Sequence, residues 1–148
     1  MPKPATERGI RVLLVDDDET ILRDYGRLLR AQGFGVEAAG SGSLALERLA
    51  DRNYDVIVSD VSMPEMTGLE FMRAVRARDL DIPIVLVTGL LDLNSAVQAI
   101  EYGAFRYLLK PVETDALVHV LEKGANLHKL AALKREALFV SGSEGMEL

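Results

Sequence analysis

Aspartate, threonine and lysine residues stand at the ends of four short apolar segments of this 148-residue sequence. Asp16 and Asp17 follow the first of these segments, and Asp60, Thr88 and Lys110 end three later ones. Neighbouring carboxylates repel one another and raise each other's pKa unless a cation intervenes. Oxygen ligands select hard cations, and a site with few carboxylates suits Mg²⁺. A carboxylate can also accept a phosphoryl group, and a metal, a lysine ammonium and a hydroxyl together assist such a transfer.

The segments that carry these residues are predicted to be strands that alternate with helices. Apolar runs too short for helices predict strands over 11–16, 35–39, 55–60, 81–88 and 106–111. Apolar residues at helical spacing predict helices over 20–32, 41–52, 68–78, 95–102 and from 115 onward. Five such repeats indicate an α/β fold in which helices cover both faces of a parallel sheet. Because ligands bind outside the carboxyl ends of such strands, the polar residues are expected to form one site.

The composition excludes several other classes of protein. Seventeen Lys and Arg residues against 23 Asp and Glu residues give a net charge of −6, which argues against direct binding of nucleic acid. The absence of cysteine excludes disulfides, thiolate zinc sites and cysteine nucleophiles, and it fits a cytoplasmic protein. No apolar segment approaches the roughly 20 residues that cross a bilayer, and residues 1–8 do not resemble a signal peptide. We therefore expect no membrane association.

The chain is predicted to consist of a flexible N-terminus (1–8), a folded domain (9–125) and an extended helix with a tail (126–148). Helical character extends to about Leu138, because no proline interrupts this part of the sequence. Within the extension, the spacing of a short coiled-coil seam is followed by Leu130, Leu133, Ala137 and Val140. Residues 141–145 contain only serine, glycine and one glutamate, which predicts a flexible linker.

The sequence resembles the receiver domain of two-component response regulators over about residues 9–125. The resemblance rests on Val-Asp-Asp-Asp at 15–18, Ser-Asp-Val-Ser-Met-Pro-Glu-Met-Thr-Gly at 59–68, Val-Thr-Gly at 87–89 and Leu-Lys-Pro at 109–111. It implies a flavodoxin-like (βα)5 fold whose five-stranded parallel sheet has the order 2-1-3-4-5. It also implies a phosphorylation-dependent signalling switch that catalyses only its own phosphorylation and dephosphorylation.

The resemblance assigns Asp60 as the phosphoacceptor, which a sensor histidine kinase or a phosphotransfer protein would phosphorylate. It implies that Asp17 and Asp60 bind Mg²⁺ directly, with the main-chain carbonyl of Ser62 as a further ligand. Asp16 would either bind the ion or orient a water molecule bound to it. Mn²⁺ is an alternative, because oxygen ligands accept either ion. The only two histidines, His119 and His128, are predicted on the last helix, away from this site, and are expected at the surface.

Further roles implied by the resemblance concern the switch. Thr88 and Lys110 would contact the phosphoryl oxygens, and Gly89 would leave room for the phosphoryl group to enter. The Lys110–Pro111 bond is expected to be cis. On phosphorylation the Thr88 hydroxyl would move toward the phosphate and Tyr107 would turn inward. The alternative is that Tyr107 only packs half-buried beside its strand.

Two expectations concern output and timing. The fourth helix, fifth strand and fifth helix would form the readout surface, which is expected to include Asn94, Gln98, Glu101, Arg106 and His119. This surface would control an output domain beyond residue 148, a separate partner, or a second copy that also pairs through the extended last helix. Leu90 and Ser62 would flank the water that hydrolyses the acyl phosphate. Because Leu90 cannot hydrogen-bond to that water, we expect slow self-dephosphorylation.

Two other interpretations start from the same residues. Residues 16–20 fit the Asp-x-Asp-x-Thr signature of haloacid-dehalogenase-type phosphatases, with Asp16 as the nucleophile and Asp18 as the general acid. That family needs a further acidic pair after its lysine, and the sequence after Lys110 offers only Glu113 and Asp115 at a helix start. The aspartate that becomes phosphorylated distinguishes the two interpretations: Asp60 for a receiver domain and Asp16 for a phosphatase. A third reading, an interaction module with an inactive site, is disfavoured because every expected site residue is present.

Overall fold

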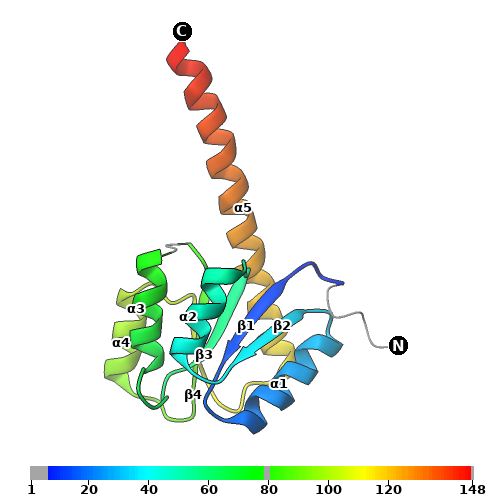
Figure 1. The fold of residues 1–148 in the computed structure, drawn as a ribbon, viewed down its shortest axis with the longest axis vertical. Coiled ribbons are helices and arrows are strands. Elements are labelled where there is room, and N and C mark those ends of the chain that lie inside the picture. Colours follow the sequence, from blue (N-terminus) through cyan, green and yellow to red (C-terminus); the bar gives the residue numbers. More distant parts are fainter. Residues whose placement is uncertain (1–6, 79–80, 148) are drawn as a thin grey trace.

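The computed structural model describes residues 7–78 and 81–147, in which five strands alternate with five helices (Figure 1). The strands are β1 (Arg11–Val15), β2 (Gly35–Ala39), β3 (Val56–Asp60), β4 (Ile84–Thr88) and β5 (Arg106–Leu109). The helices are α1 (Glu19–Ala31), α2 (Gly42–Asp51), α3 (Gly68–Arg78), α4 (Leu93–Glu101) and α5 (Thr114–Glu147). Each element overlaps its predicted range, so the α/β alternation read from the sequence is confirmed.

The strands form one parallel sheet in the order β2-β1-β3-β4-β5. The central strand β3 is buried along its whole length, whereas β5 is a partly exposed edge strand. The predicted flavodoxin-like fold with strand order 2-1-3-4-5 is therefore confirmed. Because all strands run in one direction, their carboxyl ends lie along the same edge of the sheet, where a ligand site is expected.

Alternate strand residues face opposite layers of helices, as the two-residue period of a strand requires. In β3, Ile57 belongs to one hydrophobic core, and Val56 and Val58 belong to the other. The helix residues of the first core come from α2, α3 and α4 and include Ala45, Phe71 and Ala99. Those of the second come from α1 and α5 and include Leu29, Leu117 and Leu121. The sheet is thus covered by helices on both faces.

Short polar side chains begin four of these helices. Asp18 accepts hydrogen bonds from two backbone N–H groups at the start of α1. Ser41 caps α2 and Asp92 caps α4, each by accepting a hydrogen bond from one backbone N–H group. Thr67 and Glu70 exchange hydrogen bonds of 3.1 Å at the start of α3, which is a capping box. These caps fix where each helix begins after its preceding strand, and so they fix the loops at the carboxyl edge of the sheet.

Helix α5 projects well beyond the rest of the domain (Figure 1). It continues to Glu147 through residues 141–145, so the linker predicted there is helical in the structure. No proline interrupts these positions, and a helix passes through glycine at a cost of about 1 kcal/mol per residue. Leu130 and Leu133 of the predicted seam are 61% and 63% exposed. Despite the length of α5, no helix within 7–78 and 81–147 is apolar enough to span a membrane.

The N-terminus is held to the domain from Arg8 onward, whereas residues 1–6 of the predicted flexible segment lie outside the described residues. The backbone N–H of Arg8 donates to the carbonyl oxygen of Gly33 at 3.0 Å. Its guanidinium group donates to the carbonyl oxygen of Gln32 and pairs with the carboxylate of Glu122. These contacts join the start of the chain to the end of α1 and to α5.

Candidate functional site

The alternation of side chains along the strands brings Asp16, Asp60 and Lys110 together at the carboxyl edge of the sheet. Asp60 ends β3, Asp16 directly follows β1, and Lys110 directly follows β5. The strand residues two positions earlier all contact the core formed with α1 and α5, and these are Leu14, Val58 and Leu108. Because side chains two residues apart in a strand point the same way, the three polar side chains share one side of the edge.

Lys110 is in contact with two of the aspartates. Its Nζ atom lies 3.0 Å from Oδ2 of Asp16 and 3.3 Å from Oδ1 of Asp60. The side chains of both aspartates are less than 10% exposed, and that of Lys110 is 19% exposed. A buried carboxylate requires a compensating charge, and both aspartates share the single positive charge of the lysine ammonium.

Burial and neighbouring charge shift the ionisation of this cluster. Burial, and then the negative charge of Asp16, raise the pKa of the Asp60 carboxyl group, while Lys110 opposes the shift. Burial by itself would lower the pKa of Lys110, but its hydrogen bonds and charge interactions with Asp16 and Asp60 outweigh it and raise this pKa. Lys110 is therefore held in its charged form, and the ionised form of Asp60 is left partly uncompensated.

Asp17 completes a group of three carboxylates that could hold a cation. One carboxylate oxygen from each of Asp16, Asp17 and Asp60 lies within 4.8 Å of the others. With Lys110 charged, this group retains a net charge of −2 when all three aspartates are ionised. An oxygen-only donor set with that residual charge fits a hard divalent cation. The three aspartates named from the sequence as metal ligands therefore lie together, and Ser62 follows in the β3–α3 loop.

Thr88 is the buried last residue of β4, and its hydroxyl forms hydrogen bonds with the backbone of the next loop. The hydroxyl donates to the carbonyl oxygen of Leu90 at 3.0 Å and accepts from the Leu90 N–H at 3.2 Å. Contact with a phosphoryl group would therefore require it to leave Leu90. A Cβ atom added at Gly89 would meet no atom within 4 Å, so the position beside Thr88 is open. The Lys110–Pro111 peptide bond is cis, as the sequence analysis expects.

Tyr107 of β5 is half-buried and packs against the core formed with α2, α3 and α4. Its hydroxyl oxygen is buried and has no hydrogen-bond partner among the described residues. The aromatic ring is thus well packed, but the hydroxyl group at its end lacks a hydrogen bond among the described residues. This agrees with the half-buried packing given above as the alternative for Tyr107, and it leaves the hydroxyl available for a partner after a rearrangement.

Asp18 does not have the surroundings expected of a general acid. One of its carboxylate oxygens caps α1 by accepting from the N–H groups of Thr20 and Ile21 at 2.9 and 3.4 Å. Its backbone N–H donates to Asp16, whose other oxygen binds Lys110. Asp18 therefore works as a helix cap and as support for Asp16, and the phosphatase arrangement is not supported.

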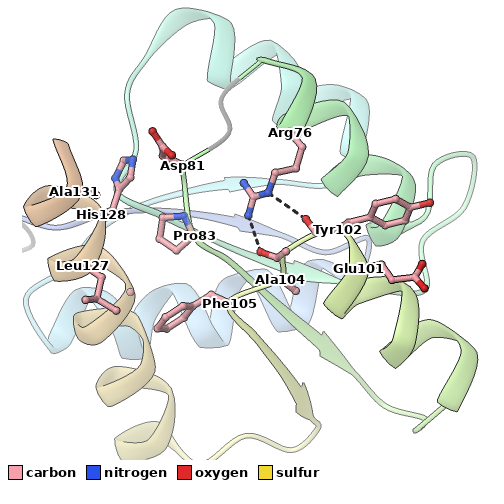
Figure 2. Close-up of a pocket in the computed structure, with 12 residues that line it drawn as sticks. Arg76, Asp81, Pro83, Glu101, Tyr102, Ala104, Phe105, Leu127, His128 and Ala131 are labelled. Carbon is pink, nitrogen blue, oxygen red and sulfur yellow. Dashed lines mark hydrogen bonds between the residues drawn. The ribbon is translucent and has the colours of Figure 1, made fainter. Parts of the chain in front are cut away.

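A cavity lies at the other end of the sheet, where the strands begin (Figure 2). It has a volume of about 710 Å³, and apolar side chains in its wall include Pro83, Phe105 and Leu127. Arg76 projects toward it but donates to the carbonyl oxygens of Tyr102 and Gly103 at 3.3 and 3.0 Å (Figure 2). It also donates to the carbonyl oxygen of Ile82 at 2.7 Å. The cavity therefore lies away from the acidic cluster, and sequence patterns gave no indication of it.

The remaining predicted residues are not part of the acidic cluster. His119 is exposed, and His128 is half-buried in the wall of the cavity in Figure 2. The expected readout residues on α4, β5 and α5 are all exposed, and these are Asn94, Gln98, Glu101, Arg106 and His119. The same region exposes large apolar side chains, which are Leu90, Leu91, Leu93, Val97, Ile100 and Leu109. Exposed apolar patches of this kind mark sites of protein–protein contact.

Comparison with known proteins identifies relatives of the whole domain. Residues 12–122 match the model of the response regulator receiver domain. The transcriptional regulatory protein ZraR of Escherichia coli O157:H7 is 37% identical over 128 residues, which cover 86% of this chain and 29% of ZraR. The C4-dicarboxylate transport transcriptional regulatory protein DctD of Rhizobium meliloti is 36% identical over 141 residues, which cover 93% of this chain and 30% of DctD. This chain therefore spans less than a third of these two relatives.

Solved structures show the same similarity. A response regulator receiver domain protein from Clostridium thermocellum superposes with a TM-score of 0.79 at 31% identity and covers 82% of this chain and 98% of its own. A structure described as adenylate cyclase from Rhodopirellula baltica superposes with a TM-score of 0.81 at 32% identity and covers 86% of this chain and 96% of its own. Sequence and fold thus point to the same group of proteins.

Proposed function

Because this chain belongs to the response regulator receiver domain family, we propose that Asp60 accepts a phosphoryl group from a phosphohistidine. The donor would be a sensor histidine kinase or a phosphotransfer protein. A carboxylate oxygen of Asp60 attacks phosphorus, and the P–N bond breaks. The imidazole nitrogen keeps the bonding electron pair and takes up a proton from solvent, so that histidine leaves neutral. The observation that carries this proposal is the position of Lys110 Nζ, within 3.3 Å of both Asp16 and Asp60 in a buried acidic cluster.

The cation site of this proposal consists of Asp16, Asp17 and Asp60, with the main-chain carbonyl of Ser62 as a further ligand for Mg²⁺ or Mn²⁺. When bound, the cation would supply positive charge opposite the charge on the transferring phosphoryl group. Lys110, which is already charged and held between two aspartates, is placed to contact a phosphoryl oxygen on Asp60.

Thr88 would provide the first movement of the switch. Its hydroxyl would exchange the two hydrogen bonds with Leu90 for one with a phosphoryl oxygen. Since Leu90 stands in the loop before α4, this exchange would release the start of that helix. Tyr107 would then reposition its unpaired hydroxyl and change the surface formed by α4, β5 and α5.

The output of the switch would be carried by this surface and by α5. A second copy of the chain, a partner protein or an output domain beyond residue 148 would bind there, and two extended α5 helices would pair through Leu130 and Leu133. In support, ZraR and DctD are longer proteins described as transcriptional regulators. The protein would act in the cytoplasm, where a kinase could reach it, and this segment would not itself bind nucleic acid.

Phosphorylation by a small phosphodonor tests the proposal directly. The wild-type chain incubated with phosphoramidate and Mg²⁺ should gain the mass of one phosphoryl group, and Asp60→Asn should gain none. Asp24→Asn, which alters an exposed aspartate of α1, is the matched control and should behave as wild type. Continued modification of Asp60→Asn would contradict the proposal, and a label on Asp16 would support the phosphatase alternative instead.

A further inference from the structure

Ser59 is a buried polar residue to which the proposed function gives no role. The buried polar side chains in the described part of the chain are Asp16, Ser59, Asp60 and Thr88. Ser59 is fully buried in the central strand β3, where it pairs with Val15 of β1 and Leu86 of β4. A hydroxyl in such a layer is costly unless it is hydrogen-bonded, and an apolar residue would fill the space without that cost.

The hydroxyl of Ser59 has a partner in the backbone of the phosphoacceptor. It donates a hydrogen bond of 2.9 Å to the main-chain carbonyl oxygen of Asp60. That carbonyl belongs to the peptide group between Asp60 and Val61, whose N–H donates to the carbonyl oxygen of Val87 at 3.1 Å. Both polar atoms of this peptide group are therefore held, one by a side chain and one by β4.

Gly68, the first residue of α3, closes on the same peptide group. A Cβ atom at Gly68 would lie 2.1 Å from the carbonyl oxygen of Asp60 and 2.9 Å from Cα of Val61. The N–H of Gly68 also donates to the carbonyl oxygen of Val61 at 2.8 Å. The helix backbone thus leaves the Asp60 carbonyl no space to move toward α3, and only glycine permits so close an approach.

We propose that Ser59 is a positioning residue for phosphorylation: its hydroxyl fixes the orientation of the Asp60–Val61 peptide group. The inference rests on the proposed function, because it takes Asp60 as the acceptor. Rotation of this peptide group would reorient the Cα–Cβ bond of Asp60, which carries the carboxylate, on one side. On the other side it would redirect the backbone that leads through Val61 to the Ser62 carbonyl. Both oxygens belong to the proposed cation site, so one hydrogen bond orients two of its ligands. Ser59 itself contacts neither the phosphoryl group nor the cation.

Removing the hydroxyl should therefore impair metal binding and phosphorylation more than stability. We expect Ser59→Ala to weaken Mg²⁺ binding, measured by calorimetry on the unphosphorylated chain, by about tenfold, the factor that corresponds to one hydrogen bond. The rate constant for phosphorylation by phosphoramidate at saturating Mg²⁺ should fall by a similar factor. Ser59→Thr, which keeps the hydroxyl, should restore both quantities.

The control is Ser41→Ala, which removes the hydroxyl that accepts from Leu44 N–H at the start of α2. It should lower the melting temperature and leave Mg²⁺ affinity and phosphorylation unchanged. If Ser59→Ala behaves like Ser41→Ala, the hydroxyl serves only the fold and the inference is wrong. If the wild-type chain is not phosphorylated, the proposed function fails instead, so the two failures are distinguishable. The result for Ser59→Ala decides the question even if the added methyl group of Ser59→Thr prevents folding.

Discussion

Tyr107→Phe removes a single oxygen atom that is buried without a hydrogen-bond partner in the described structure, while the packed ring remains. In the unfolded chain the same hydroxyl is hydrogen-bonded to water. On folding, the tyrosine hydroxyl loses its hydrogen bond to water, whereas phenylalanine has no such hydrogen bond to lose. The substitution is expected to stabilise the protein, which is unusual because most core substitutions destabilise.

The size of the effect follows from the cost of an unsatisfied buried polar group, which is about 1–3 kcal/mol. Taking the lower limit for this single neutral hydroxyl, we expect the free energy of unfolding to rise by about 1 kcal/mol. For a domain of this size, that change corresponds to an increase in melting temperature of about 3 °C. Thermal and urea unfolding, followed by circular dichroism, would measure it.

Tyr54→Phe provides a matched control with the opposite expected sign. The Tyr54 hydroxyl donates to Oε2 of Glu37 at 2.7 Å, and burial raises the pKa of Tyr54 to about 12. Loss of this bond to a charged acceptor should destabilise by about 2 kcal/mol. The same bond is the main cause of the lowered pKa of Glu37. Its stabilising effect is present above the ordinary glutamate pKa and is lost as pH falls, so the difference from wild type should shrink in acid.

Destabilisation by Tyr107→Phe, of the kind expected for Tyr54→Phe, would refute the reasoning, because it would mean that the Tyr107 hydroxyl has a partner in the folded protein. Both variants should still be phosphorylated by phosphoramidate, since neither alters the acidic cluster. A loss of phosphorylation in Tyr107→Phe would show instead that this substitution disturbs the fold of β5. Unfolding and modification therefore need to be measured on the same samples.

Three further outcomes are expected. Asp60→Asn should be more stable than wild type at neutral pH, because burial and the charge of Asp16 raise the pKa of Asp60 in the folded protein. The wild-type protein loses stability as pH rises through that pKa. The difference in stability between the two proteins should therefore vanish in acid. Arg76→Met removes donors from three backbone carbonyl groups and should lower the free energy of unfolding by about 2 kcal/mol, visible as a lower urea midpoint. Leu90→Gln should shorten the lifetime of the phosphorylated protein several-fold, because the amide can orient water; an unchanged rate of phosphate release would contradict this.

The sequence was sufficient for the fold and for the acidic cluster because both depend on short-range patterns. Five apolar runs alternate with five helical patterns, and this alternation permits few topologies. Asp16 and Asp60 were placed together because parallel strands end along one edge, and Asp17, Thr88 and Lys110 stand at the same strand ends. The two-residue period then decides which side of the sheet each of them faces.

Other features depend on contacts that spacing does not encode. Ser59 was visible as a polar residue inside an apolar run, but its bond to the Asp60 carbonyl requires coordinates. The clash that excludes any residue but glycine at position 68 is likewise tertiary, because it arises between α3 and β3. The helical structure of residues 141–145 was missed because glycine and serine are weak helix formers, and their intrinsic preference does not reveal that α5 continues through them.

β5 connects the acidic cluster with the part of α5 that packs against the opposite end of the sheet. Lys110, directly after this strand, contacts Asp60, and Phe105, directly before it, packs beside Gly124 of α5. A Cβ atom at Gly124 would lie only 3.2 Å from the Phe105 ring, so the glycine permits this close packing. As an edge strand bonded to β4 alone, β5 can shift with the loss of fewer hydrogen bonds than the central strands. In the proposed switch, a movement of Lys110 would be passed toward α5 through this short strand, which also carries Tyr107.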